Sequence, residues 1–286
     1  MTDSPLCSPT ELRERLGILV LLDARTGADA RASYEAAHLP GARFLDLETE
    51  LAGPHPDASE GGRHPLPEPS AFARRLAGMG VGAESDVVVY DTQGGANAAA
   101  RAWWMIRALG HRRVRVLDGG LAAAVAAGVP TTNELPTPRP VTPLEATSWQ
   151  LPVLPIEAID AWTRDPRRVL VDVRAPGRYR GEVEPIDPIA GHIPGARNLF
   201  HMDHLGADGR FRAPEEIAAQ VRAVVGDRPT EAIAVHCGSG VTACHAILAM
   251  EHAGLGIPSL YVGSWSEWCR RDLPRAKGPS PREGES

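Results

Sequence analysis

The amino-acid sequence predicts an α/β protein made of two copies of one domain, each a mainly parallel sheet flanked by helices on both faces. In both halves short apolar strands alternate with helical stretches, as parallel sheets require. The same landmarks recur at a spacing of roughly 150 residues, far beyond the period of a solenoid. A proline-rich stretch between the copies is expected to be a semi-rigid linker. We therefore expect a first domain at residues 1–130, the linker at 131–155, a second domain at 156–275 and a disordered tail at 276–286.

Each copy repeats one order of elements. A first strand ends in Asp-x-Arg, and a nearly identical His-x-Pro-Gly-Ala pentapeptide follows it. A second strand ends in a polar residue and leads into a glycine-bearing loop and an alanine-rich helix, and a third strand closes the copy. Because the pentapeptides occur in both copies, we expect His38 and His192 to be structural. The paired strands are 18–25 with 168–174, 86–91 with 232–237, and 114–120 with 259–265, and the pentapeptides are 38–42 and 192–196.

The copies differ at the end of the second strand, where the first has Asp91 and the second has Cys237. In parallel sheets ligands bind outside the carboxyl ends of the strands. The loop N–H groups and the positive end of the helix at 243–253 should converge on the Cys237 sulfur, an environment that favours a thiolate. Asp91 is expected to cap a helix or anchor its loop. The sequence therefore predicts that only the second copy is catalytic.

Four motifs together resemble the tandem-domain rhodanese family of sulfurtransferases, over about residues 16 to 273. They are the loop 237–243, the paired pentapeptides, Asp-Gly-Gly at 118–120 and Gly-Ser-Trp-x-Glu-Trp at 263–268. The loop is similar to that of the 3-mercaptopyruvate branch. The thiosulfate branch typically has basic residues after the cysteine, where this chain has Gly238 and Ser239.

The resemblance implies that Cys237 takes a sulfur atom from 3-mercaptopyruvate as a persulfide and passes it to a thiol, such as a thioredoxin, or to cyanide, without a cofactor or metal. The backbone of Gly238, Gly240, Val241 and Thr242 would line the cradle for the sulfur anion, and both glycines are expected at positive φ. Thiosulfate as the donor at the same site is the alternative. A sulfur carrier without turnover is less expected.

The resemblance also assigns Arg178 to donor binding. Relatives often have a second arginine about nine residues later; Ile186 and Asp187 occupy that place, so the second contact is missing or comes from elsewhere. Arg174 is expected to pair with a carboxylate inside its domain.

By resemblance, Ser239, His64 and an acid could form a proton relay for the departing enolate. Glu48 is the expected acid, and Asp46 is the alternative. The simpler interpretation, that His64 only lines the cleft, stays equally open.

Composition excludes several other classes of protein. A net charge of -6 without a basic block argues against nucleic acid. No apolar run reaches the roughly 18 residues of a membrane span, and residues 1–10 lack a signal-peptide pattern, so we expect a cytoplasmic protein. The four cysteines form no Cys-x-x-Cys pair, which argues against disulfides and zinc. A cysteine phosphatase would need arginine where Ala243 stands.

Overall fold

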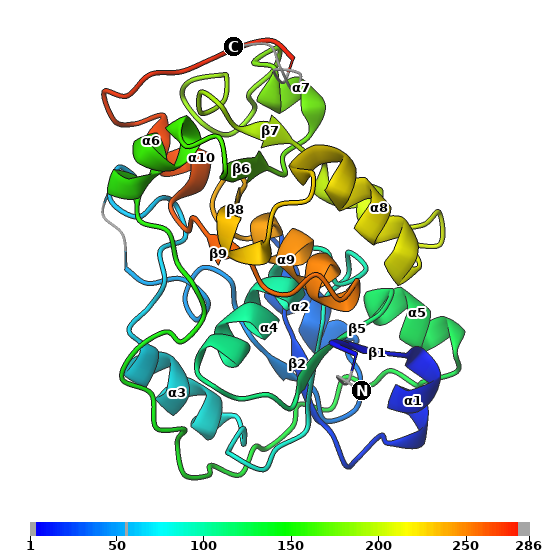
Figure 1. The fold of residues 1–286 in the computed structure, drawn as a ribbon. Helices are drawn as coiled ribbons and strands as arrows, with labels where there is room; N and C mark the ends of the chain where they lie inside the picture. Colours follow the sequence, from blue (N-terminus) through cyan, green and yellow to red (C-terminus); the bar gives the residue numbers. More distant parts are fainter. Residues whose placement is uncertain (1–3, 55–56, 280–286) are drawn as a thin grey trace. The chain divides into compact units, whose positions relative to one another are not determined.

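The computed structural model describes residues 4–54 and 57–279, so part of the expected tail, 280–286, lies outside the described residues. The chain forms two compact units (Figure 1). Unit 1 holds residues 4–53, 67–151 and 205–211, and unit 2 holds 54, 57–66, 152–204 and 212–279. Residues 57–66 thus pack with unit 2, although they lie within the first copy of the sequence.

Within the described residues, unit 1 contains a five-stranded parallel sheet in the order β1-β5-β4-β2-β3. Its central strand β4 has the sequence Val-Val-Val-Tyr and is buried throughout, as β-branched strands in parallel sheets are. The strands are β1 Leu6–Cys7, β2 Val20–Asp23, β3 Arg43–Phe44, β4 Val87–Tyr90 and β5 Val114–Leu117. The helices are α1 Pro9–Glu14, α2 Ala30–Ala36, α3 Pro69–Gly78, α4 Ala98–Ala108 and α5 Gly120–Ala126.

The described part of unit 2 contains a four-stranded parallel sheet in the order β7-β6-β8-β9, so the predicted pair of parallel-sheet α/β domains is confirmed. The strands are β6 Val169–Asp172, β7 Arg197–Asn198, β8 Ile233–His236 and β9 Ser259–Leu260. The helices are α6 Ile156–Arg164, α7 Pro176–Tyr179, α8 Pro214–Val225, α9 Thr242–His252 and α10 Ser264–Trp268, with 3-10 turns η1 His201–His204 and η2 Thr230–Ala232.

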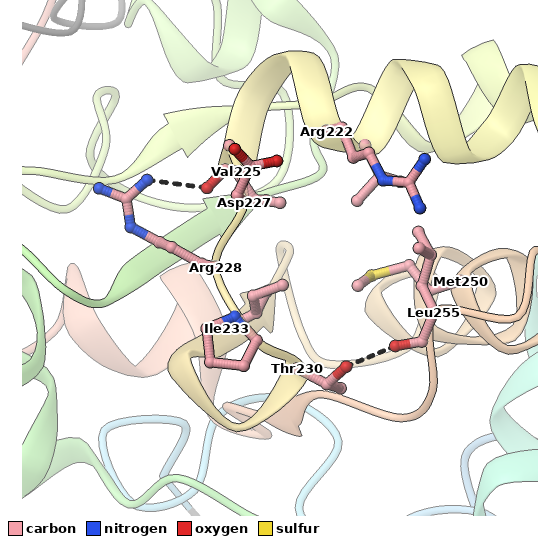
Figure 2. A pocket seen from close by; sticks show the side chains of 11 residues that line it. Arg222, Val225, Asp227, Arg228, Thr230, Ile233, Met250 and Leu255 are labelled. Atoms are coloured by element: carbon pink, nitrogen blue, oxygen red, sulfur yellow. Dashed lines mark hydrogen bonds between the residues drawn. The ribbon is translucent and has the colours of Figure 1, made fainter.

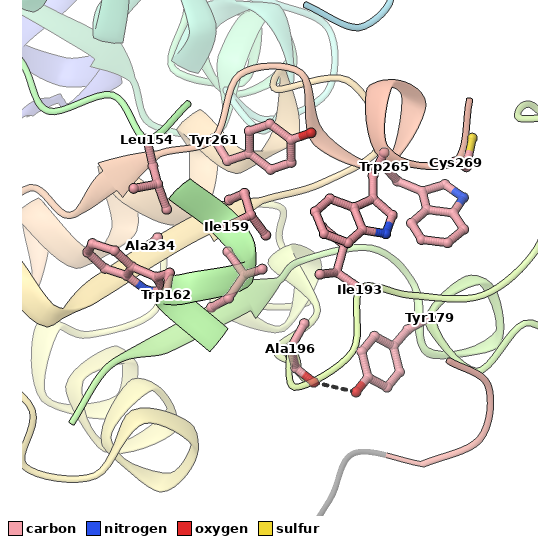
Figure 3. Packing of buried hydrophobic residues seen from close by; sticks show 12 residues of the cluster. Leu154, Ile159, Trp162, Tyr179, Ile193, Ala196, Ala234, Tyr261, Trp265 and Cys269 are labelled. Carbon is pink, nitrogen blue, oxygen red and sulfur yellow. Dashed lines mark hydrogen bonds between the residues drawn. The ribbon is translucent and has the colours of Figure 1, made fainter. Parts of the chain in front are cut away.

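The hydrophobic core beside the unit 2 sheet is built from large side chains of α6, α7 and α10 (Figure 3). Trp265 and Trp268 are buried in it. Tyr179 is buried as well and donates its hydroxyl to the carbonyl oxygen of Ala196 at 2.6 Å. This bond ties α7 to the turn at 192–196, which leads into β7.

The repeated pentapeptides make the same contacts in both units, which confirms their structural role. The Nδ1 atom of His192 lies 2.8 Å from the carbonyl oxygen of Tyr179, and the two rings stack with centroids 3.9 Å apart. In unit 1, Nδ1 of His38 lies 2.7 Å from the carbonyl oxygen of Tyr34, with centroids 4.2 Å apart. Each histidine therefore fastens its turn to a short helix.

The proline-rich stretch between the copies has an extended course along unit 1. Val141 donates its N–H to the carbonyl oxygen of Ala77 at 3.1 Å, and Gln150 donates to that of Ala108 at 2.7 Å. These bonds attach it to the ends of α3 and α4. Among the described residues, no helix is both long and apolar enough to cross a bilayer.

Candidate active site

Cys237 lies between the end of β8 and the start of α9, as predicted, and only 1% of its surface is exposed. The N–H of Gly240 points at its Sγ atom at 3.1 Å. Its own N–H donates to Oγ of Ser264 at 3.1 Å, and its carbonyl accepts from the N–H of Trp265 at 3.0 Å. A negative charge on Sγ is therefore stabilised by a backbone N–H and by the positive end of α9.

The two loop glycines are required for different reasons. Gly240 has φ +75°, and a Cβ atom there would lie 2.5 Å from the carbonyl oxygen of Val262. Gly238 does not have a positive φ, so that expectation was wrong for it. A Cβ at residue 238 would instead lie 3.3 Å from a guanidinium nitrogen of Arg63 and 3.6 Å from two of Arg178. Gly238 thus leaves room for two cations.

Ser264 is a site residue that the sequence did not reveal. Among the described residues it is the one non-glycine with positive φ, at 55°, a conformation that costs about 1–3 kcal/mol. Its hydroxyl donates to the carbonyl oxygen of Tyr261 at 2.9 Å and accepts the N–H of Cys237. These bonds fix the backbone of the cysteine, which explains why the strain is tolerated.

Arg178 comes from α7, and its guanidinium group lies beside Gly238 of the Cys237 loop. Its Nη2 atom bonds Oε1 of Glu184 at 2.6 Å and lies 3.5 Å from Oδ2 of Asp187. The side chain is 17% exposed, so its charge remains accessible to a small anion. The two carboxylates hold the guanidinium group beside Gly238.

The segment 57–66 brings two further side chains to this site. It is fastened to α10: the N–H of Gly61 donates to Oε1 of Glu267 at 3.0 Å, and the N–H of Arg63 donates to Oγ of Ser266 at 3.1 Å. His64 follows, and its Nδ1 atom lies 2.8 Å from Oγ of Ser239. The structure therefore brings His64 and Ser239 together.

The acid expected in the relay belongs to unit 1. Oδ1 of Asp46 accepts the N–H groups of Glu48 at 3.0 Å and Thr49 at 2.9 Å, and also the hydroxyl of Thr49 at 2.8 Å. Asp46 thus stabilises its own turn. A contribution of Glu48 to the relay stays a prediction.

Arg174 and its neighbours form a buried network next to the cysteine. The guanidinium group binds the Asp172 carboxylate at 2.6 and 3.0 Å and the carbonyl oxygen of Gly191 at 2.7 Å, which confirms its structural role. Burial opposes the charge on Arg174, but the Asp172 carboxylate outweighs it and raises the pKa of Arg174. Burial lowers the pKa of His236 to about 4, so His236 is neutral at pH 7.

The matching loop of unit 1 encloses a carboxylate. The oxygens of Asp91 accept backbone N–H groups of four residues of the loop and the start of α4, and the side chain is buried. The donors are Gln93 and Gly95 at 2.8 Å, Asn97 at 3.1 Å and Ala99 at 3.3 Å. Burial raises the pKa of Asp91, while these bonds oppose the rise. The expected loop-anchoring role is confirmed.

A pocket of about 250 Å³ in unit 2 lies apart from this chemistry (Figure 2). It is formed by the end of α8, the loop that follows and the end of α9, and its polar lining includes Arg222, Asp227 and Thr230. It touches β8 at Ile233, the first residue of the strand, whereas Cys237 follows the last. This pocket is at the wrong end of the strand to be the reaction site.

This chain belongs to the family of rhodanese-like domains, whose model matches residues 8–127 and 156–271. It is similar to the "Probable 3-mercaptopyruvate sulfurtransferase" of Pseudomonas aeruginosa, with 44% identity over 94% of this chain and 96% of that one. It is 35% identical to the thiosulfate sulfurtransferase of Mus musculus, over 90% of this chain and 86% of the relative. The solved 3-mercaptopyruvate sulfurtransferase from Leishmania major matches with a TM-score of 0.82 and 33% identity, covering 93% of this chain and 74% of that one.

Proposed function

We propose that this protein moves a sulfur atom from 3-mercaptopyruvate, through a persulfide on Cys237, to a thiol or to cyanide. One observation carries the proposal: Sγ of Cys237 accepts the Gly240 N–H at the start of α9, with the guanidinium groups of Arg63 and Arg178 beside the neighbouring Gly238. That arrangement suits a sulfur nucleophile and an anionic donor. The names of the relatives support the same chemistry.

In the first half-reaction the Cys237 sulfur anion attacks the donor sulfur. A sulfur–sulfur bond forms, the carbon–sulfur bond of mercaptopyruvate breaks, and its electron pair goes to the carbon as the enolate of pyruvate. The enolate takes up one proton to give pyruvate. In the second half-reaction cyanide attacks the outer sulfur, and thiocyanate leaves with the Cys237 anion restored. A thiol acceptor takes the same sulfur as a new persulfide. In a reduced dithiol such as a thioredoxin, the second thiol then attacks the first, so that a disulfide forms and the outer sulfur leaves as sulfide.

The loop and the Ser239–His64 pair have separate tasks in this scheme. The N–H groups of Gly238, Val241 and Thr242, with that of Gly240, would face the negative charge on sulfur. The hydroxyl of Ser239, 2.8 Å from Nδ1 of His64, would deliver the proton to the enolate. Glu48 is proposed to orient the histidine.

We also propose that the protein works in the cytoplasm. All four cysteines are free thiols, which fits a reducing compartment.

The test is to load the protein and follow its turnover. We expect Cys237 to gain the mass of one sulfur atom on exposure to mercaptopyruvate, and to cycle repeatedly when cyanide or a dithiol is present. A higher kcat/KM with thiosulfate would favour the alternative donor. A single loading without turnover would show a carrier and overturn the proposed enzyme.

Replacing His64 by glutamine is expected to lower kcat with mercaptopyruvate roughly 10- to 100-fold, because the enolate loses its proton source. With thiosulfate we expect less than about a threefold change, since sulfite leaves as a stable anion that needs no proton. Steady-state kinetics with both donors measure the difference. His252→Gln, at the far end of α9, is the matched control. Equal losses with the two donors would contradict the relay and leave His64 a structural role.

A further inference from the structure

Two guanidinium groups meet beside the residue that follows the nucleophile. The three atoms nearest to a Cβ built on Gly238 are one nitrogen of Arg63 and two of Arg178, at 3.3 and 3.6 Å. The two arginines are far apart in the sequence: Arg63 belongs to the segment 57–66 and Arg178 to α7. Their side chains are 22% and 17% exposed, so both charges remain open to a small ligand.

Asp187 holds these arginines together. Its carboxylate is fully buried and forms ion pairs with Arg63, with Arg178 at 3.5 Å and with Arg270 at 2.8 Å. A buried carboxylate is costly unless cations surround it, so Asp187 requires this gathering. Together with Glu184, which binds Arg178, the cluster has three positive and two negative charges. One net positive charge is left beside the Cys237 loop.

We infer that Arg63 is the second cation for the carboxylate of the sulfur donor, acting with Arg178. The inference rests on the proposed function. It identifies a residue that can replace the second arginine, which this chain lacks at residues 186 and 187. Asp187 occupies the place of the second arginine and forms an ion pair with Arg63, which comes from the segment 57–66. The cation is therefore supplied by Arg63, which lies close in space but far away in the sequence.

The position of the two guanidinium groups suits a donor that carries a carboxylate a few bonds away from its sulfur atom. Neighbouring Cα atoms are about 3.8 Å apart, and mercaptopyruvate separates its sulfur from its carboxyl carbon by roughly 4 Å. A donor whose sulfur meets Cys237 is therefore long enough for its carboxylate to reach the guanidinium groups beside Gly238. Guanidinium groups bind carboxylates through paired N–H donors, which fixes the orientation of the ligand as well as its affinity.

The charge also qualifies an expectation from the sequence. The loop itself carries no basic residue, which favours mercaptopyruvate over thiosulfate, yet two cations reach it from elsewhere. The test must therefore compare donors with and without a carboxylate, because total charge does not separate them.

Arg63→Gln is expected to raise the KM for mercaptopyruvate about tenfold and to change kcat less than about threefold, because a remote carboxylate contact is equally strong in the ground and transition states. With a mercaptomethyl ketone that lacks the carboxylate as the donor, the KM of Arg63→Gln should stay within about twofold of the KM of the wild-type protein for the same ketone. Arg63→Lys should recover part of the loss, since it keeps the charge without the paired donors. Calorimetry with mercaptopyruvate in the Cys237→Ser background should show the same roughly tenfold weaker Kd.

The matched control is Arg212→Gln, which removes an exposed guanidinium group that pairs with Glu216 of α8, outside the Asp187 cluster, and is expected to keep KM within about twofold. An unchanged KM in Arg63→Gln, or equal increases for the two donors or for the two variants, would overturn the role of Arg63 while the proposed function stands. A wild-type protein whose Cys237 never gains sulfur would instead overturn the proposed function, and the calorimetric result would still decide whether Arg63 binds the donor.

Discussion

Cys237→Ser is expected to abolish sulfur transfer, with kcat lower by about a thousandfold or more. A serine hydroxyl is not ionised at neutral pH and cannot form the sulfur–sulfur bond on which the first half-reaction depends. The fold should persist, because the side chain is small and the bonds of the Cys237 backbone to Ser264 and Trp265 do not involve the sulfur. Turnover with cyanide, and intact mass after exposure to the donor, measure the effect.

Cys7→Ala provides the matched control for this experiment. Burial raises the pKa of Cys7 to about 12, so this thiol is protonated at neutral pH and a poor nucleophile. The variant should therefore keep the wild-type turnover and still gain one sulfur atom. Sulfur transfer that survives in Cys237→Ser, or a sulfur atom found on Cys7, would contradict the assignment of the nucleophile.

The features that the sequence predicts are those determined by residues close together in the chain. The alternation of apolar strands and helices specifies parallel sheets, and the repeated pentapeptides predict paired turns that the structure confirms at His38 and His192. The sequence points to Cys237 and Asp91 because each follows an apolar strand that is buried in the structure. In each case the information lies within a few residues of the feature.

The missed features depend on contacts between distant parts of the chain or on a backbone conformation. Arg63 meets Asp187 across 124 residues, and no local pattern predicts that the segment before Leu66 packs against α10. The only signal was the position of Arg63 directly before His64. Ser264 adopts a positive φ that serine rarely takes, so the sequence around it does not predict this conformation. The sequence predicts a turn role for Gly238, whereas in the structure the space beside it is needed by the side chains of Arg63 and Arg178.

Comparison of the two copies explains what a catalytic loop of this kind must supply. In unit 1 the carboxylate of Asp91 occupies the centre of a ring of backbone N–H groups, and its burial is tolerated because four of them donate to it. In unit 2 the sulfur of Cys237 takes the corresponding place and accepts the N–H of Gly240. Both loops thus stabilise negative charge, but only the second presents an atom that can bond to sulfur.

Gly240→Ala is expected to damage both stability and activity. At φ +75° any side chain is strained, and a Cβ atom would lie 2.5 Å from the carbonyl oxygen of Val262, well inside contact distance. The backbone must shift, which we expect to lower the free energy of unfolding by about 3 kcal/mol. The shift would also move the N–H of residue 240 away from Sγ of Cys237. Loss of one such donor should lower kcat/KM about 100-fold.

Gly254→Ala separates the effect of backbone strain from that of the steric clash with Val262. Gly254 follows α9 with φ +74°, nearly the value at Gly240, but a Cβ atom there would meet nothing within 4 Å. We expect it to lower the free energy of unfolding by about 1 kcal/mol and to leave kcat/KM unchanged, because only the backbone strain is added. Urea unfolding and steady-state kinetics of both variants provide the comparison. If the two variants lose equal stability and both remain active, the contact with Val262 does not shape the loop, and the orientation of the N–H toward sulfur is not what activates the cysteine.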